Sequence, residues 1–220
     1  MTRRDAVIGL AATAIASASG QGSASGAEPA IIELPAAQLD GGKPLMQALA
    51  LRRSSRDYAS GSTLPAQMLS NLLWAAFGVN RPASGDRTAP YWRHVMVMDV
   101  YAAMADGVWL YDPAGHKLRL HMQGDIRRQT GLQDFVADAP LNLVYVAHGK
   151  RMHDVSAEDR RLYASVDAGF IGQNVYLFCA SEGLASVFRA AVDYKKLEKA
   201  MQLEVEQFVT FAQTVGYAKG

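Results

Sequence analysis

The sequence lacks the features of disulfide-bonded, nucleic-acid-binding and membrane-spanning proteins. Cys179 is the single cysteine, so the chain forms no internal disulfide. Lys and Arg number 22 against 21 Asp and Glu, which leaves no basic excess for binding nucleic acid or an anionic membrane surface. No run of about eighteen apolar residues predicts a membrane span. We therefore expect neither nucleic acid as a partner nor a membrane-spanning segment.

Motifs for several kinds of chemistry are absent as well. No Gly-x-Gly-x-x-Gly follows a predicted strand and no Walker loop occurs, so Rossmann and P-loop nucleotide sites are not expected. No two histidines lie close together in the sequence with a carboxylate or cysteine residue nearby, so no metal site is predicted. Cys179 falls within an apolar helical pattern without a neighbouring base, which is typical of an inert core thiol. Neither Ser54 nor Ser55 has the setting of a hydrolase nucleophile.

The N-terminal stretch differs from the rest in composition. Arg3 and Arg4 precede an apolar run of small residues, and a Gly/Ser/Ala-rich tract follows. This order is typical of an export signal. The arginine pair resembles a twin-arginine signal, with Ala6 where an aromatic residue or Leu is frequent. Cleavage after Ala18 and cleavage after Ala27 both fit the pattern, and both remain open. The protein is expected to be exported to the periplasm.

Residues 1–27 are thus predicted to be the export signal, and residues 28–220 a single domain. Half of the chain is apolar and no repeat occurs, which suits one well-filled core. Helices and strands alternate without a regular βαβ pattern, so the predicted class is α+β. Helices are expected from Pro44 to the Arg52 region and at 65–77, 125–134, 156–183 and 194–201, and strands at 95–101, 108–111, 117–120, 141–147, 185–191 and 207–216.

Two of these elements are expected to lie in the core. The strand at 141–147 is the most apolar and should be central in the sheet. The helix at 156–183 has Ser156 as a predicted N-cap and Gly183 as its C-terminal glycine, and it is apolar nearly all the way round. Gln173 and Asn174 interrupt this helix. Buried amides need partners, so they should bind neighbouring backbone or reach a ligand.

One short segment concentrates positive charge. Residues 52–56 read Arg-Arg-Ser-Ser-Arg and follow the first predicted helix directly. Guanidinium forks match phosphate oxygens, and Ser hydroxyls can complete such a site. The simpler interpretation is a solvated helix end, where cations favour the helix dipole. The segment alone does not decide between these interpretations.

Several motifs follow one another in a familiar order. They are Arg52–Tyr58 after a first helix, Leu72–Arg81 on a second, Ala139–Pro140 before the central strand, Gly169 with Gln173–Asn174 on the long helix, Glu182–Leu184, and the terminal Gly216–Tyr217. This series resembles the FMN-dependent nitroreductase family over almost the whole of residues 28–220. The ending Gln213–Tyr217 is similar to that of the branch that includes azoline-oxidising dehydrogenases of peptide maturation.

The resemblance implies a nitroreductase-like fold, with a central antiparallel sheet flanked by helices, in an intertwined homodimer that binds FMN at each end of its interface. In the family, the first Arg and the Ser of the basic segment hold the phosphate and ribityl chain, and the last basic residue approaches the flavin pyrimidine. A basic residue beyond the terminal Gly-Tyr can also reach the phosphate. The implied FMN-binding residues are Arg52, Arg53, Ser54, Arg56, Arg189, Ala190 and Lys219.

The activity that the resemblance implies is ping-pong hydride transfer through the flavin N5, from a small-molecule donor to an electron-poor acceptor such as a nitroaromatic compound or a quinone. No catalytic side chain is implied, because the flavin carries the chemistry. Free nicotinamide nucleotides are scarce outside the cytoplasm, so an exported member would use another donor or act as an oxidase-like dehydrogenase.

Two departures from the family pattern favour an alternative. The family loop reads Arg-Thr-Ala-Pro-Ser-Ala-x-Asn, whereas Arg87–Pro90 is followed directly by Tyr91 and Trp92, so the flavin-contacting Ser and Asn have no counterpart. Ala190 stands where Gly is common, and its Cβ would crowd a ring edge that approaches the backbone. The alternative is a flavin-free binding or accessory protein of the same fold.

Overall fold

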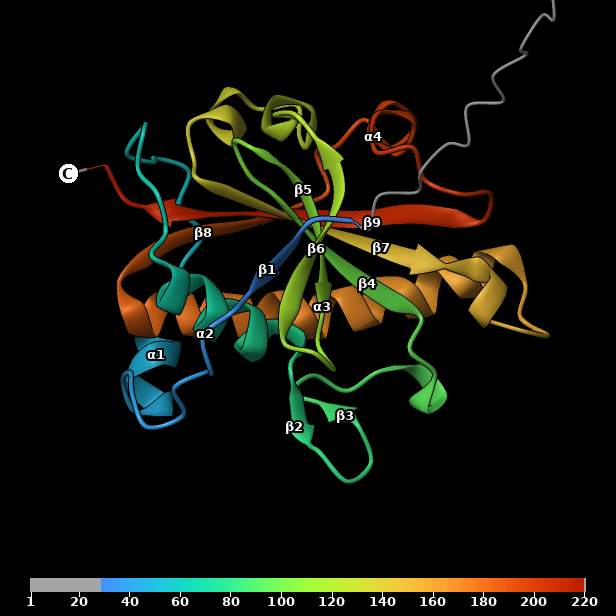
Figure 1. Ribbon diagram of the computed structural model, residues 1–220, viewed down its shortest axis with the longest axis horizontal. Coiled ribbons are helices and arrows are strands. Elements are labelled where there is room, and N and C mark those ends of the chain that lie inside the picture. Colours follow the sequence, from blue (N-terminus) through green and yellow to red (C-terminus); the bar gives the residue numbers. More distant parts are fainter. Residues whose placement is uncertain (1–28, 220) are drawn as a thin grey trace, which may run out of the picture.

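The computed structural model describes residues 29–219 (Figure 1). The predicted export signal lies outside the described residues. Four α-helices are present in this part of the chain: α1 (Leu45–Leu51), α2 (Ala66–Phe77), α3 (Ala157–Glu182) and α4 (Tyr194–Ala200). The strands are β1 (Ile31–Glu33), β2 (Val79–Arg81), β3 (Asp86–Arg87), β4 (Met98–Ala103), β5 (Gly107–Asp112), β6 (Lys117–Gln123), β7 (Leu141–His148), β8 (Leu184–Arg189) and β9 (Gln207–Tyr217).

Seven strands form one sheet in the order β1-β6-β5-β4-β7-β9-β8, and every pair in it is antiparallel. β7 lies between β4 and β9, and all but its last residue is buried. An antiparallel strand that is buried on both faces reads as a continuous apolar run. The predictions of an α+β fold and of a central strand at 141–147 are therefore confirmed.

Helices cover both faces of this sheet. In Figure 1, α3 runs along the lower side of the sheet and α4 lies above it. The larger core fills the space between the sheet and the α2–α3 pair, with Leu72, Leu143 and Ile171 fully buried. A smaller core lies under α4 and contains Val144, Leu197 and Met201. Among residues 29–219, no helix is long and apolar enough to cross a membrane.

α3 begins and ends as its sequence predicts. Ser156 Oγ accepts a hydrogen bond from the Asp159 N–H at 3.1 Å, and Gly183 takes a left-handed conformation with φ of 75°. Glycine adopts that conformation without the penalty that a Cβ imposes. The helix is buried only on its sheet-facing side, however. Its outer side exposes apolar residues, so the expectation of burial nearly all round is wrong for the monomer.

Two predicted elements differ in the structure. The helix expected at 125–134 is replaced by two 3-10 turns, Arg127–Gln129 and Asp134–Ala137. Asp125 Oδ1 accepts the Arg127 N–H at 2.9 Å, and such local side-chain bonds compete with helix formation. The strand expected at 95–101 begins only at Met98, because the chain first turns with positive φ at Arg93 and His94.

Candidate functional site

The basic segment at 52–56 lies along the free edge of the sheet. Arg52 closes α1, donating its N–H to Ala48 O at 2.9 Å, and the chain then continues in extended form. The Ser55 N–H donates to Ser186 O of β8 at 2.9 Å. β8 is an edge strand whose outer groups would otherwise lack partners, so this contact fixes the segment against the sheet.

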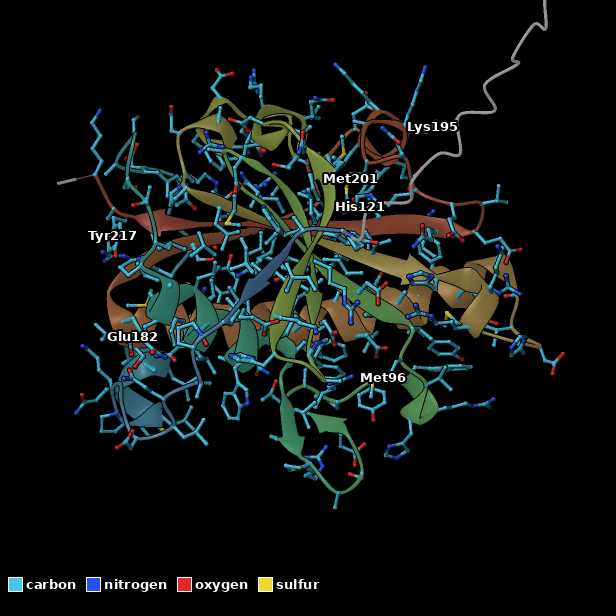
Figure 2. The ribbon with its side chains drawn as sticks, in the orientation of Figure 1. Met96, His121, Glu182, Lys195, Met201 and Tyr217 are labelled. Atoms are coloured by element: carbon cyan, nitrogen blue, oxygen red, sulfur yellow. The ribbon has the colours of Figure 1, made fainter. Side chains whose placement is uncertain are left out.

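The C-terminal end of β9 reaches the same place. Tyr58 forms an antiparallel bridge with Ala218, and the Lys219 N–H donates to Asp57 O at 3.3 Å. Figure 2 shows Tyr217 and Glu182, which end β9 and α3, at one end of the molecule. The fold thus brings Lys219 beside the basic segment, although the two are far apart in the sequence.

Tyr176 on α3 ties the basic segment to β8, and the sequence did not single it out. Its hydroxyl oxygen accepts the Phe188 N–H at 2.8 Å and lies 2.7 Å from Ser54 Oγ. The guanidinium of Arg52 lies over the Tyr176 ring, 5.2 Å from its centroid, which is within cation–π range. Tyr176 therefore holds both Arg52 and Ser54.

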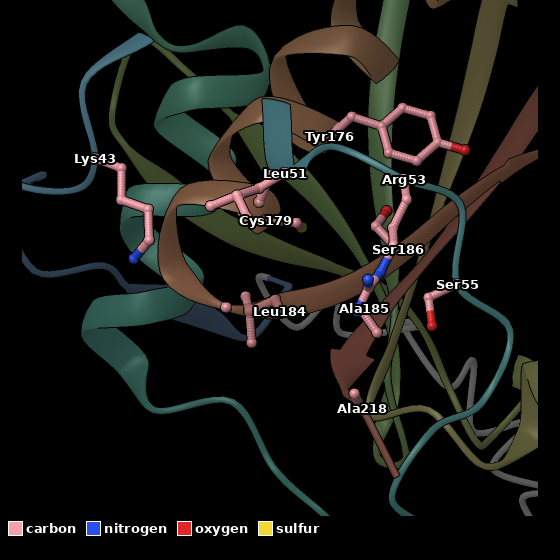
Figure 3. Close-up of a pocket in the computed structure, with 12 residues that line it drawn as sticks. Lys43, Leu51, Arg53, Ser55, Tyr176, Cys179, Leu184, Ala185, Ser186 and Ala218 are labelled. Carbon is pink, nitrogen blue, oxygen red and sulfur yellow. The ribbon is translucent and has the colours of Figure 1, made fainter. Parts of the chain in front are cut away.

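A pocket of about 220 Å³ opens beside this segment (Figure 3). Arg53 and Ser55 form one side of it together with Ala185 and Ser186 of β8, and Lys43 lies on the opposite side in this view. The floor includes Cys179, whose thiol pKa is raised to about 12 by burial. A thiol that stays protonated is unreactive, so the polar groups of the rim define the chemistry of the pocket.

The positive charge at this site has no ion-pair partner among the described residues. Among residues 29–219, no carboxylate forms an ion pair with Arg52, Arg53 or Arg56. Six other arginines in the same part of the chain do have such partners. Of these three arginines only Arg53 lines the pocket, and Arg52 and Arg56 lie beside it on the same segment. Three guanidiniums on one short segment, without an ion-paired carboxylate among the described residues, fit an anionic group such as a phosphate.

The side chain of Arg189 does not join this site, which corrects the expectation for that residue. It is 4% exposed and lies on the opposite face of β8 from Phe188, which packs toward α3. Burial lowers the pKa of the Arg189 guanidinium to about 10. The Arg189 guanidinium donates three hydrogen bonds within the protein, to Thr214 Oγ1 at 3.1 Å, Thr130 O at 3.0 Å and Asn142 Oδ1 at 3.1 Å. Ala190, the next residue, is exposed at the end of β8.

The shortened loop after Pro90 packs onto its own chain. The Trp92 N–H donates to Asp167 Oδ2 at 3.0 Å, and the Trp92 ring stacks on Tyr163 with centroids 5.8 Å apart. Asp167 is buried on α3, and this desolvation raises the pKa of its carboxyl to about 6. Arg93 and His94 then take positive φ values of 45° and 57°. The loop therefore closes against α3 at some cost in backbone strain.

A second and larger cavity, of about 660 Å³, lies between α1, α2 and α3. Asn174 lines it and has no side-chain hydrogen bond to another described residue, whereas Gln173 is exposed. Of the two amides, only Asn174 thus meets the expectation that it faces a ligand-sized space. Trp74 also lines this cavity and donates its Nε1–H to Val79 O at 3.2 Å.

The antiparallel seven-stranded sheet, the long helix across it and the cationic segment at its edge define a nitroreductase-fold protein. The chain belongs to the Nitroreductase family, which its residues 49–217 match. A protein of Methanocaldococcus jannaschii with a provisional nitroreductase name is 30% identical over 171 residues, which cover 73% of this chain and 85% of that protein.

Solved structures agree with this assignment. A crystal structure from Ralstonia eutropha JMP134, also provisionally named a nitroreductase, has a TM-score of 0.82 and 41% identity, covering 88% of this chain and 94% of the other. The NADPH:FMN oxidoreductase of Vibrio harveyi, complexed with NAD+, has a TM-score of 0.59 at 17% identity, covering 80% and 69%, and shows the fold alone. The family match and the relative of Methanocaldococcus jannaschii support a nitroreductase-like oxidoreductase function.

Proposed function

We propose that this protein is an FMN-dependent oxidoreductase that passes electrons from a small-molecule donor to an electron-poor acceptor, such as a nitroaromatic compound or a quinone. The observation that carries the proposal is the set of guanidiniums at Arg52, Arg53 and Arg56, which no described carboxylate neutralises. A flavin phosphate would supply the missing negative charge.

The residues present fit the phosphate end of the cofactor. Arg52 and Arg53 would hold the phosphate, Ser54 would donate to it or to the ribityl chain, and Arg56 would hold the ring. The pocket of about 220 Å³ is smaller than the roughly 300–1,000 Å³ of complete small-molecule sites. It therefore suits the tail of the cofactor, and the ring needs further surface.

That further surface would come from a second copy of the chain. The outer side of α3 exposes Leu162, Val166 and Phe170, by 56%, 47% and 45%. Apolar patches of this kind mark interaction sites on soluble proteins. We propose that two copies pack through α3 in the intertwined homodimer that the family resemblance implies, so that each copy completes the ring site of the other.

When bound, FMN supplies the two-electron chemistry by taking a hydride from the donor and passing it to the acceptor. The contribution of the chain is to bind and orient. Tyr176 fixes Ser54 at 2.7 Å, and Ser55 is fixed through its N–H to β8, so the phosphate-binding groups are held before a ligand arrives. Such preorganisation lowers the entropy that binding must overcome.

The cellular setting is a further part of the proposal. We propose that residues 1–27 direct export to the periplasm by the twin-arginine route and are then removed, leaving residues 28–220 as one domain. That route carries folded proteins, which suits a chain that acquires its cofactor in the cytoplasm. In the periplasm the donor would be something other than a free nicotinamide nucleotide.

One observation favours a second candidate, a flavin-free binding or accessory protein. The loop after Pro90 offers neither the Ser nor the Asn of the family pattern, and its backbone N–H at Trp92 is already occupied by Asp167 at 3.0 Å. Groups that would contact the ring are therefore fewer than the family pattern provides. The basic segment remains intact, and for this reason we rank the enzyme first.

The visible spectrum of the purified protein tests the proposal. We expect a yellow preparation, or a colourless one that takes up FMN on incubation and keeps it through gel filtration. Arg52→Ala combined with Arg56→Ala should abolish retention, because one cation that would hold the phosphate and one that would hold the ring are lost. Arg128→Ala, an exposed arginine paired with Asp134 at 2.6 Å, is the matched control and should retain FMN. A wild-type protein that takes up no FMN would establish the flavin-free candidate instead.

A further inference from the structure

Arg87 on β3 carries a guanidinium whose buried donors have no acceptor. Its Nε and Nη1 atoms are shielded from solvent and make no hydrogen bond to any described residue. The guanidinium carbon lies 5.7 Å from the centroid of the Phe77 ring, which supports the flat face of the group and leaves its edges free. Buried polar atoms in native proteins nearly always form a hydrogen bond. Buried donors of a charged group that have no partner in the protein therefore indicate a bound water molecule or ion.

These donors face a small enclosed space. A cavity of about 50 Å³ is lined by Arg87, Phe77, Met96, Met98 and Tyr111, among others. Figure 2 shows Met96 toward the β2–β3 hairpin, away from the Tyr217 end, so the cavity is distinct from the FMN pocket. The Tyr111 hydroxyl lies 3.0 Å from His116 Nδ1 and is already engaged there. The wall also includes Asp99, whose carboxylate pairs with Arg151 and His148, and the apolar residues Val100 and Pro113. None of the described side chains accepts a hydrogen bond from Arg87 Nε or Nη1.

The charge of Arg87 also lacks an ion-pair partner among the described residues. Three carboxylates lie near it or in the wall of the cavity, but each has a closer cation of its own. Arg81 Nε pairs with Asp86 Oδ2 at 3.2 Å, and Arg119 Nη2 pairs with Asp112 Oδ2 at 2.7 Å. Asp99 has two partners, Arg151 Nη1 at 3.2 Å from Oδ1 and His148 Nε2 at 2.5 Å from Oδ2. After these pairs are formed, Arg87 is the cation of this group that makes no ion pair with a described carboxylate, although Asp86 and Asp112 lie near enough to attract its charge.

We propose that this cavity binds a monovalent anion of about the size of chloride, held by one edge of the Arg87 guanidinium. A space of about 50 Å³ takes one or two occupants of water size, which admits a halide and excludes a phosphate ester. Nε and Nη1 lie on different edges of the planar group, so one anion occupies one edge and a water molecule the other. Water alone would bond the donors but would leave the charge without an ion-pair partner.

The anion is expected to stabilise the native fold, because it binds only where β3, α2 and the β5–β6 turn meet. In wild-type protein, the thermal midpoint should rise with chloride in the millimolar range, at ionic strength held constant with sodium fluoride. The rise should saturate and amount to about 3 °C once chloride is tenfold above its dissociation constant. Fluoride is the reference because its strong hydration opposes entry into an apolar cavity.

Two variants and one diffraction measurement decide the matter. Arg87→Met should abolish the chloride dependence, and Arg81→Met, in the same hairpin, should keep it. Crystals of the wild-type protein soaked in bromide should show an anomalous peak within hydrogen-bond distance of Arg87. This measurement decides alone if Arg87→Met does not fold. An empty or water-filled cavity in bromide, or an equal chloride response in Arg87→Met, would overturn the proposal. The site is independent of FMN, so its failure leaves the proposed function untouched.

Discussion

The hydroxyl groups of Tyr176 and Ser54 share one hydrogen bond, in which either can be the donor. The Tyr176 oxygen accepts the Phe188 N–H, and its own proton has Ser54 Oγ as its one described acceptor, 2.7 Å away. When Tyr176 is the donor of this bond, Ser54 Oγ accepts from it and keeps its own hydroxyl proton for an outside group. In that arrangement the chain from the Phe188 backbone through Tyr176 to Ser54 ends in a Ser54 proton that is free for an anionic group such as a phosphate.

Tyr176→Phe removes the middle of this chain and should weaken FMN binding about tenfold, since one hydrogen bond to a charged group contributes roughly 1.5 kcal/mol. Riboflavin, which lacks the phosphate, should bind the variant as it binds wild type. Dissociation constants from flavin fluorescence quenching measure both effects.

A double-mutant cycle provides the control. Ser54→Ala should lower FMN affinity by a similar factor, and the combination with Tyr176→Phe should lose little more, because both changes break the same chain. Losses that multiply in the double variant, or an equal loss of riboflavin binding, would show that Tyr176 acts through the fold and not through Ser54.

At the scale of elements, the distance between α3 and β8 depends on a glycine. A Cβ built at Gly172 would overlap the ring of Phe188, and its next contact would be Gln213 Oε1 at 3.2 Å. Gln213 is fully buried and accepts the Tyr145 hydroxyl at 2.6 Å. The close approach of helix and strand is what lets Tyr176, one turn further along α3, reach the backbone of Phe188.

Gly172→Ala should lower the free energy of unfolding by about 1–3 kcal/mol, the usual cost of overpacking a core. It should also weaken FMN binding, since β8 would move away from Tyr176. The measurements are urea unfolding at one protein concentration and flavin titration.

Gly169→Ala is the matched control within the same helix. A Cβ at Gly169 meets nothing within 4 Å, so the substitution should raise the free energy of unfolding by about 0.5–1 kcal/mol through helix propensity alone. Equal effects of the two substitutions would contradict the role given to the Gly172–Phe188 contact.

The same elements show what the sequence could predict. The α3 boundaries followed from Ser156 and Gly183, because end signals act locally. The helices α1, α2 and α4 likewise lie within the ranges expected for them. The stretch 125–134 has helix-forming composition, but bonds between near neighbours such as Asp125 and Arg127 replaced the helix with turns.

The candidate site was predictable in part for a similar reason. The basic segment is contiguous, so its charge is visible in the sequence, and Lys219 followed from the family resemblance. Tyr176 is 122 positions from Ser54 and carries no local signal. Arg189 was misassigned because the sequence does not show which face of β8 its side chain occupies, and that face led it into the buried network with Thr214 and Asn142.

At the scale of the whole molecule, the apolar outer side of α3 has no cover within the described chain. Leu162, Val166 and Phe170 recur at spacings of four residues, which places them on one side of a helix. α1 adds Leu45 and Met46, exposed by 62% and 75%. Helices that are apolar on both sides are buried on both sides in stable assemblies. The proposed second copy on this surface would explain why the sequence of α3 has the pattern of a fully buried helix.

Val166→Glu combined with Phe170→Glu should therefore convert the protein from a dimer to a monomer, because two charges on each copy would be buried against their symmetry mates. Sedimentation velocity at micromolar concentration measures the change. If the partner completes the ring site, the monomer should also lose FMN at concentrations where wild type retains it. Val205→Glu, at a position 81% exposed between α4 and β9, is the control and should stay dimeric. A wild-type monomer, or a variant that remains dimeric, would remove α3 as the interface and with it the shared ring site.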